Sequence, residues 1–221
     1  MDERIARYLK QFGLTDLFPV HVRQLMHIKA YAGGERLFTQ GEEAHALYLL
    51  VDGKLKISML SPEGKRLIAA FKTPFDLVGD IEYVQACPLI NTVEAVTETQ
   101  VIRIPFPVLR NEMADNAAWL QFLLETITRK FEVRSRVMNF NLLYAVDVRI
   151  ASYLLSMTPD RAVIDSTSLV DMADLIGTSY RHLNRVLEQF EQAGWITKKR
   201  GKITIYNREA LLEQAGHNIY E

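Results

Sequence analysis

The sequence predicts an α+β protein made of an N-terminal double-stranded β-helix (jelly roll), a long helix and a C-terminal winged helix-turn-helix. Three observations lead to this fold class. Short apolar runs separated by turn residues occupy residues 20–107. Apolar residues then recur at heptad spacing over residues 120–138, and two amphipathic helical patterns flank a glycine within residues 168–194.

The composition is that of an ordinary globular protein, with 48% hydrophobic and 24% charged residues. Lys and Arg total 26 against 27 for Asp and Glu, a formal net charge of −1. This balance excludes coating of nucleic acid by overall charge. The chain has no apolar run long enough for a membrane span, and its first residues lack the apolar core of a signal peptide. A cytoplasmic protein with no membrane partner is expected.

The N-terminal part, residues 1–110, is expected to be a sensor domain. Ile5, Leu9 and Phe12 lie on one face of a first helix, which Gly13 ends. Turn residues such as Asp52-Gly53 then separate short apolar runs, and regularly spaced short strands are typical of a jelly roll. Strands are expected at residues 36–39, 46–51, 54–60, 67–71, 92–96 and 100–104.

Residues 111–139 are expected to form a dimerisation helix. Its seam steps by 4, 3, 4, 3 and 4 residues through Leu120, Leu124, Ile127, Phe131, Arg134 and Met138. A helix this long has little of its own β domain to pack against along its whole length, so pairing with a second copy would bury the seam. The alternative is an amphipathic helix that packs only on its own domain.

Residues 140–221 are expected to form the DNA-binding domain. After an apolar helix over residues 146–157, Ser168 can cap a short helix that Gly177 ends, and Thr178 or Ser179 can cap a second helix that stops at Gly194. This spacing predicts a helix-turn-helix. The expected inward residues are Leu169, Met172, Ala173 and Ile176 in the first helix and Leu183, Val186, Leu187 and Phe190 in the second.

The outward side chains of the second helix and the basic segment behind it predict a DNA-binding surface. Residues 196–205 contain two short strand-like runs around a basic tip, which predicts a wing able to contact phosphates. From residue 178 to residue 208, seven basic and two acidic residues give a local charge of +5. The candidate DNA-binding residues are Thr178, Ser179, Tyr180, Arg181, His182, Arg185, Lys198, Lys199, Arg200 and Lys202.

The order of these parts resembles the CRP/FNR family of bacterial transcription regulators. In the N-terminal part the resemblance rests on Gln40-Gly41-Glu42, on the run from Leu47 to Ile57, and on Gly64 and Gly79. It implies a homodimer that binds a palindromic site in double-stranded promoter DNA and contacts RNA polymerase.

In the C-terminal part the resemblance rests on Ile176-Gly177-Thr178-Ser179 and on Arg185-Val-Leu. The run from Ser179 to Phe190 is similar to the recognition helix of the YeiL subfamily. Tyr180, Arg181 and Arg185 match the family's base-reading positions. Family members often carry Glu where Arg181 stands here, so the resemblance does not imply the usual operator sequence.

The resemblance also points to a candidate effector pocket around Gly79, Asp80, Asn91 and Thr92. In family members that bind cyclic AMP, a Glu accepts from the ribose hydroxyl, and an Arg some ten residues later neutralises the cyclic phosphate. Here Asp80 replaces that Glu, and Asn91-Thr92-Val93 stands where Arg-Ser-Ala would be. A phosphate without its bidentate Arg loses its main charge-assisted partner. We therefore expect an unknown small-molecule effector or none, and not cyclic AMP.

No other sensor chemistry and no cofactor is expected. Cys87 is the single cysteine, whereas an iron–sulfur cluster usually needs four, so it is either a buried small side chain or a redox-reactive thiol. The spacing of His21, His27 and His45 matches no metal-ligand motif. The sequence also lacks a phosphate-binding loop with Gly-Lys-Ser/Thr and a Gly-x-Ser-x-Gly elbow, so no enzyme activity is expected.

The sequence is compatible with three functions. The first is a homodimeric, sequence-specific transcription regulator, acting as activator or repressor, whose β-roll senses a signal. The second is a constitutive DNA binder whose roll is only a scaffold. The third is a small-molecule-binding module whose helical C-terminal domain mediates protein contacts.

Overall fold

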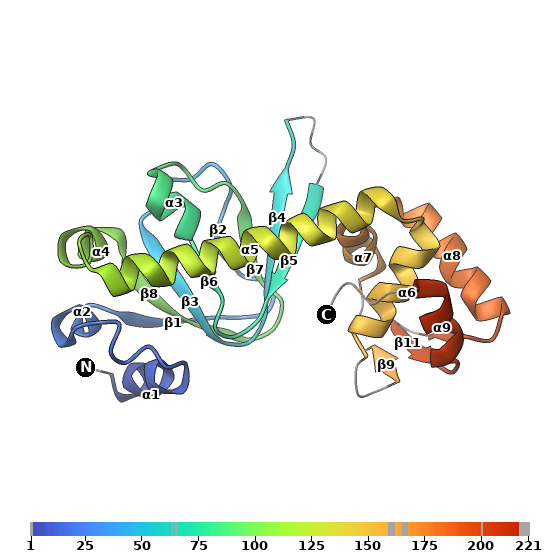
Figure 1. Ribbon diagram of the computed structural model, residues 1–221, viewed down its shortest axis with the longest axis horizontal. Helices are drawn as coiled ribbons and strands as arrows, with labels where there is room; N and C mark the ends of the chain where they lie inside the picture. The colour runs from blue at the N-terminus through green and yellow to red at the C-terminus, as the bar shows by residue number, and fades with distance from the viewer. Residues whose placement is uncertain are drawn as a thin grey trace. The chain divides into compact units, whose positions relative to one another are not determined.

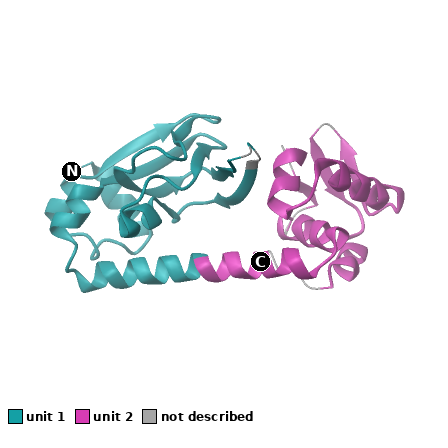
Figure 2. Cartoon of the chain, turned by 90° about the horizontal axis from the view of Figure 1, so that it is seen from above, with its two compact units in different colours: residues 1–130 teal, residues 131–221 magenta. Residues whose placement is uncertain are grey.

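A computed structural model of the chain describes residues 2–62, 64, 66–158, 162–164, 168–199 and 201–216, with Arg66 described by its backbone alone. The chain divides into two compact units, residues 1–130 and 131–221 (Figure 2). Helix α5, Ala117–Leu143, contributes to both units. Each unit is described separately below.

Unit 1 is a β-roll with helices at both of its chain ends (Figure 1). One four-stranded sheet has the order β1-β8-β3-β6 and the other the order β2-β7-β4-β5. The helices of this unit before α5 are α1 (Glu3–Gln11), α2 (Val20–Gln24), α3 (Asp80–Gln85) and α4 (Phe106–Glu112). The strands are β1 (His27–Tyr31), β2 (Arg36–Phe38), β3 (Ala46–Asp52), β4 (Leu55–Leu60), β5 (Arg66–Lys72), β6 (Leu77–Val78), β7 (Thr92–Ala95) and β8 (Thr99–Pro105).

The core of unit 1 lies on the two faces of strand β3. Leu47 and Leu49 pack toward α1, α4 and the start of α5, whereas Leu50 packs between the two sheets. Successive side chains of a strand point to opposite faces, so a strand buried on both sides is apolar along its whole length. The antiparallel pairing of β3 with β8 holds this central strand, with Leu49 opposite Ile102.

The predicted first helix and the six predicted strands are confirmed, and unit 1 contains two further strands, β1 and β6. Helix α1 begins at an Asp2 cap and buries Ile5 and Leu9, as the spacing predicted. Strand β1 was not predicted, and Tyr31 is its only buried residue. Strand β6 was missed because it contains only two residues.

Helix α5 carries a buried stripe in its first half and an exposed apolar stripe that continues beyond it. One faces the β-roll through Trp119, Leu123, Thr126 and Lys130, which are buried or nearly so. The other is the predicted seam, which lies outward. The helix thus packs on its own β-roll over its first half but not along its whole length. The predicted bounds of 111–139 also differ from those of α5, which runs from Ala117 to Leu143. Residues 111 and 112 belong to α4, and residues 113–116 separate the two helices.

Unit 2 contains the end of α5 and a winged helix-turn-helix (Figure 1). Its helices after α5 are α6 (Val146–Ser156), α7 (Leu169–Ile176), α8 (Tyr180–Gln192) and α9 (Arg208–Ala215). Its sheet has the order β10-β11-β9, formed by β9 (Val163–Ile164), β10 (Ile196–Lys199) and β11 (Lys202–Ile205). The strand β9 and the helix α9 were not predicted from the sequence.

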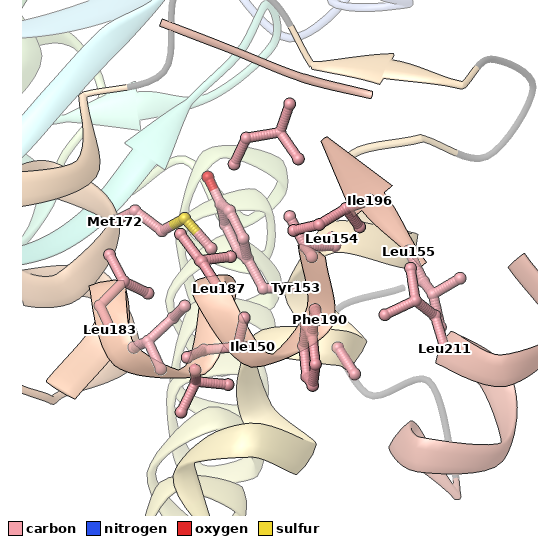
Figure 3. Packing of buried hydrophobic residues seen from close by; sticks show 14 of the residues in the cluster. Ile150, Tyr153, Leu154, Leu155, Met172, Leu183, Leu187, Phe190, Ile196 and Leu211 are labelled. Atoms are coloured by element: carbon pink, nitrogen blue, oxygen red, sulfur yellow. The ribbon is translucent and has the colours of Figure 1, made fainter. Parts of the chain in front are cut away.

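The core of unit 2 joins α6, α7, α8 and the wing (Figure 3). The predicted inward face of the second helix is confirmed, because Leu183, Val186, Leu187 and Phe190 are all buried. In the first helix, Met172, Ala173 and Ile176 are buried, and Leu169 is only partly so.

Candidate nucleic-acid interface and effector site

The turn between α7 and α8 is held by a glycine and a buried arginine. Gly177 has φ +71° and lets the chain reverse after Ile176. Arg149 of α6 is buried, and its Nη1 donates to the carbonyl oxygen of Ile176 at 2.7 Å. Because the last carbonyls of a helix have no partner within it, this contact satisfies the end of α7 where α8 departs.

Helix α8 begins at Ser179, whose Oγ accepts from the backbone N–H of His182 at 3.2 Å. Of the two caps that the sequence allowed, Thr178 and Ser179, the structure shows Ser179. Tyr180, Arg181 and Arg185 are exposed on the first turns of α8, whereas His182 is half-buried. The N-terminal part of a recognition helix is the part that contacts base edges in this motif.

The wing divides its lysines between two faces. Strands β10 and β11 pair with Lys199 opposite Lys202 and Lys198 opposite the buried Ile203. Side chains directly opposite each other share a face, and neighbouring residues alternate. Lys199 and Lys202 therefore lie together on the exposed face of the wing. Arg200 lies outside the described residues.

Lys198 faces helix α8 instead. Its Nζ donates to Oδ1 of Asn184 at 2.8 Å, and its backbone N–H donates to Oε1 of Glu191 at 2.8 Å. Asn184 was not among the sequence-predicted site residues. The alternation of the basic run could have separated Lys198 from its neighbours, but nothing in the sequence identified Asn184 as its partner.

The candidate effector site contains a buried ion pair that the sequence did not reveal. Asp80 is 4% exposed, and its Oδ2 lies 2.8 Å from Nζ of Lys130 on α5. The same Nζ donates to the carbonyl oxygen of Leu77 at 2.7 Å. Burial lowers the pKa of Lys130 below its usual value, and the charge and hydrogen bond of Asp80 oppose that shift.

Two of the other predicted pocket residues, Gly79 and Thr92, contact neighbouring strands of the β-roll or the loops beside them. Gly79 has φ +90°, and a Cβ there would lie 2.8 Å from the carbonyl oxygen of Ala46. Oγ1 of Thr92 accepts from the backbone N–H of Gln40 at 3.0 Å, and Asn91 is half-buried. Of the four predicted residues, Asp80 and Thr92 thus already have partners within unit 1.

The predicted seam of α5 is exposed within the single chain. Leu120, Leu124 and Phe131 are 49, 58 and 73% exposed, and Met138 is 58% exposed. Ile127 is half-buried, and Arg134 is exposed. An apolar stripe of this size on a long helix is typical of a surface that another chain covers.

Neither a metal site nor a membrane span is found in the part of the chain that the structure describes. No group of three or more His, Cys, Asp or Glu there could hold a metal ion. No helix there is long and apolar enough to cross a bilayer. His21 instead pairs with Glu112 at 3.1 Å, and Cys87 is half-buried.

Two protein-family models match the chain. The cyclic nucleotide-binding domain matches residues 28–116, and the Crp-like helix-turn-helix domain matches residues 148–214. Among curated proteins, a CRP-like cAMP-activated global transcriptional regulator of Mycobacterium tuberculosis is 24% identical over 223 residues, covering 97% of this chain and 100% of that protein.

Solved structures share the fold. A putative transcriptional regulator of the crp/fnr family from Eubacterium rectale has a TM-score of 0.82 at 20% identity, covering 94% of this chain and 100% of that one. The c-di-GMP responsive global regulator CLP of Xanthomonas campestris has a TM-score of 0.73 at 17% identity, covering 83% and 95%. With the two matched domains and the relatives that span it, this chain belongs to the CRP/FNR family of DNA-binding transcriptional regulators.

Proposed function

We propose that the chain acts as a homodimer on a palindromic site in promoter DNA, with the exposed side chains of α8 reading bases and the wing contacting phosphates. The observation that carries this proposal is the face formed by Tyr180, Arg181 and Arg185 on a capped helix that has its apolar side buried. Arg can pair bidentately with guanine in the major groove. Thr178, Ser179 and His182, beside the start of α8, and Lys199 and Lys202 of the wing complete the proposed surface.

We assign one role to each of three consecutive parts of the chain. These are the sensor role for residues 1–110, dimerisation for the part of α5 that lies within residues 111–139, and DNA binding for residues 140–221. Two α8 helices in a two-fold dimer read half-sites one helical turn apart. We place this regulator in the cytoplasm, with RNA polymerase as a partner and without a catalytic role.

The effector is proposed to differ from cyclic AMP. The support is that Asn91 and Thr92 offer no guanidinium for a phosphate, and that Asp80 already has a cation as partner. By name the Mycobacterium relative responds to cAMP and the Xanthomonas neighbour to c-di-GMP, so the shared fold leaves the effector open. Calorimetry with cyclic AMP tests this part, and micromolar binding would overturn it.

The DNA-binding proposal is tested by selection from a library of randomised DNA duplexes with the full chain. Enrichment of an inverted repeat, with an affinity that falls steeply with salt, is the expected result. Enrichment of no sequence would defeat it. Co-purification of chains that carry two different tags tests the homodimer, and failure of the two forms to pair would contradict it.

A further inference from the structure

The contact between Lys198 of the wing and Asn184 of α8 assigns both residues roles that the basic run alone does not indicate. Lys198 is bound to α8 at two points, through its Nζ to Asn184 and through its backbone N–H to Glu191. These two α8 residues lie seven positions apart, which is about two helical turns, so they share one side of the helix. The wing is thereby fixed along the side of the recognition helix.

The contact also fixes the orientation of the Asn184 amide. A lysine ammonium can only donate, so the atom that faces it must be the amide oxygen. The amide nitrogen then points the other way, and Nδ2 donates to the carbonyl oxygen of Tyr180 at 3.3 Å. The two ends of this amide are usually hard to distinguish, but here the charged partner decides between them.

Counting the amide's hydrogen bonds shows what remains for a ligand. A side-chain amide has two N–H donors and an oxygen with two lone pairs. The contacts with Lys198 and Tyr180 use one acceptor site and one donor. One acceptor and one donor remain, and these are the groups that an Asn uses to bind adenine through N6 and N7.

The position of Asn184 suits this role. It lies three residues after Arg181 and directly before Arg185, and it is half-buried at the border between the exposed face of α8 and the wing. Lys198 lies on the inner face of the wing with Ile196 and opposite Ile203, whereas Lys199 lies on the other face. The two neighbouring lysines thus have different surroundings.

We propose that Asn184 is a further base-reading residue with a preference for adenine, and that Lys198 is a positioning residue that orients it instead of a phosphate contact. This inference rests on the proposed function, because it requires α8 to enter the major groove. Its consequence is that a charge on the wing controls which base is preferred, while its neighbour Lys199 controls only affinity and salt dependence.

The test uses selection from randomised DNA duplexes, followed by salt titration on the duplex that the unaltered chain selects. With Lys198→Met we expect the slope of log K against log salt to stay unchanged, while discrimination at one adenine falls on the order of 10- to 100-fold. With the matched control Lys199→Met we expect the reverse. The selected sequence should persist, and the slope should weaken by about 1.8 for a dimer that loses two phosphate contacts.

A second variant, Asn184→Asp, tests the proposal independently if Lys198→Met fails to fold. Asn184→Asp retains a partner for Lys198 but has only acceptors, so we expect the preferred base at that position to change from adenine to cytosine. The proposal is overturned if Lys198→Met weakens the slope as Lys199→Met does with its selected sequence unchanged, or if Asn184→Asp leaves the base preference unaltered. Failure of the proposed function is distinguishable, since the unaltered chain would then enrich no sequence.

Discussion

Lys130 of α5 and Asp80 of α3 form an ion pair 2.8 Å long inside unit 1, with the side chains only 19% and 6% exposed. Lys130 also donates to the carbonyl oxygen of Leu77, so it binds both sides of the turn at Gly79. The helix proposed to mediate dimerisation is therefore bonded to the loop proposed to bind an effector. In this chain a carboxylate considered as a ligand group already has a cation as its partner.

Replacing Lys130 should destabilise unit 1. Lys130→Met leaves the Asp80 carboxylate buried without its cation, and removing one member of a buried pair costs about 3–5 kcal/mol. The double variant Asp80→Asn with Lys130→Met should recover most of that loss, because no isolated charge remains. Urea unfolding, followed by Trp119 fluorescence in a Trp195→Phe background, measures the difference. A Lys130→Met chain within about 0.5 kcal/mol of the parent would contradict a stabilising pair.

Charging the exposed seam of α5 should dissociate the proposed dimer. Phe131→Glu places a carboxylate at a seam position in both chains of a two-fold pair, and it also removes apolar area that the interface would bury. We expect dimer affinity to fall by at least about 100-fold. Val133→Glu is the matched control, because Val133 is 53% exposed on the same helix but lies off the seam. Analytical sedimentation of both variants measures their dimer affinity. An equal loss of affinity in the two variants would argue against the heptad register.

Removing the guanidinium of Arg185 should relax the reading of one base. Arg185→Ala is expected to cost about 1–3 kcal/mol on the selected duplex and to equalise the affinities at a single position. Competition binding with single-base variants of that duplex provides the measurement. Arg136→Ala, which removes an exposed arginine paired with Glu132 on α5, controls for general loss of charge. If affinity for every sequence falls equally, Arg185 contacts only phosphate.

Periodicity and turn chemistry made much of this fold predictable. The buried face of α8 follows from its spacing, and Ser168 and Gly177 bound α7 as their cap preferences indicate. These features are local, because each depends on residues within one or two helical turns. The seam of α5 is also a local pattern, and most of its apolar residues are exposed in the single chain, as a surface for a second chain requires.

The contacts that define the two candidate sites were not predictable in the same way. Asp80 and Lys130 are 50 residues apart, and Asn184 and Lys198 are 14 residues apart. Their partnership depends on which faces of two elements meet, a relation that one sequence does not encode by spacing. A partial signal existed for Lys130, since it continues the stripe of Trp119, Leu123 and Thr126 on the buried side of α5.

Two glycines with the same kind of backbone should tolerate alanine very differently. Gly177 has φ +71°, and an added Cβ would meet Arg149 and Asn141 only at ordinary contact distances. Gly53 has φ +87°, and an added Cβ would overlap the backbone of Glu98 and Thr99. Gly177→Ala should therefore cost about 1–2 kcal/mol from backbone strain alone, and Gly53→Ala substantially more. Urea unfolding compares them, and equal losses would mean that the β3–β4 turn shifts to accept the methyl group.

Alkaline pH should weaken unit 2 through Tyr153. Burial raises the pKa of Tyr153 to about 12, with a smaller contribution from the charge of Asp171, whereas an exposed tyrosine has a pKa of about 10. The folded state thus retains a proton that the unfolded state has lost, so this contribution to stability is complete below pH ~10 and declines as pH rises toward ~12. The free energy of unfolding should fall by about 2 kcal/mol more in the parent than in Tyr153→Phe over this range. Urea unfolding followed by circular dichroism at both ends of the range measures the decline. An equally steep decline in Tyr153→Phe would assign the alkaline sensitivity to other groups.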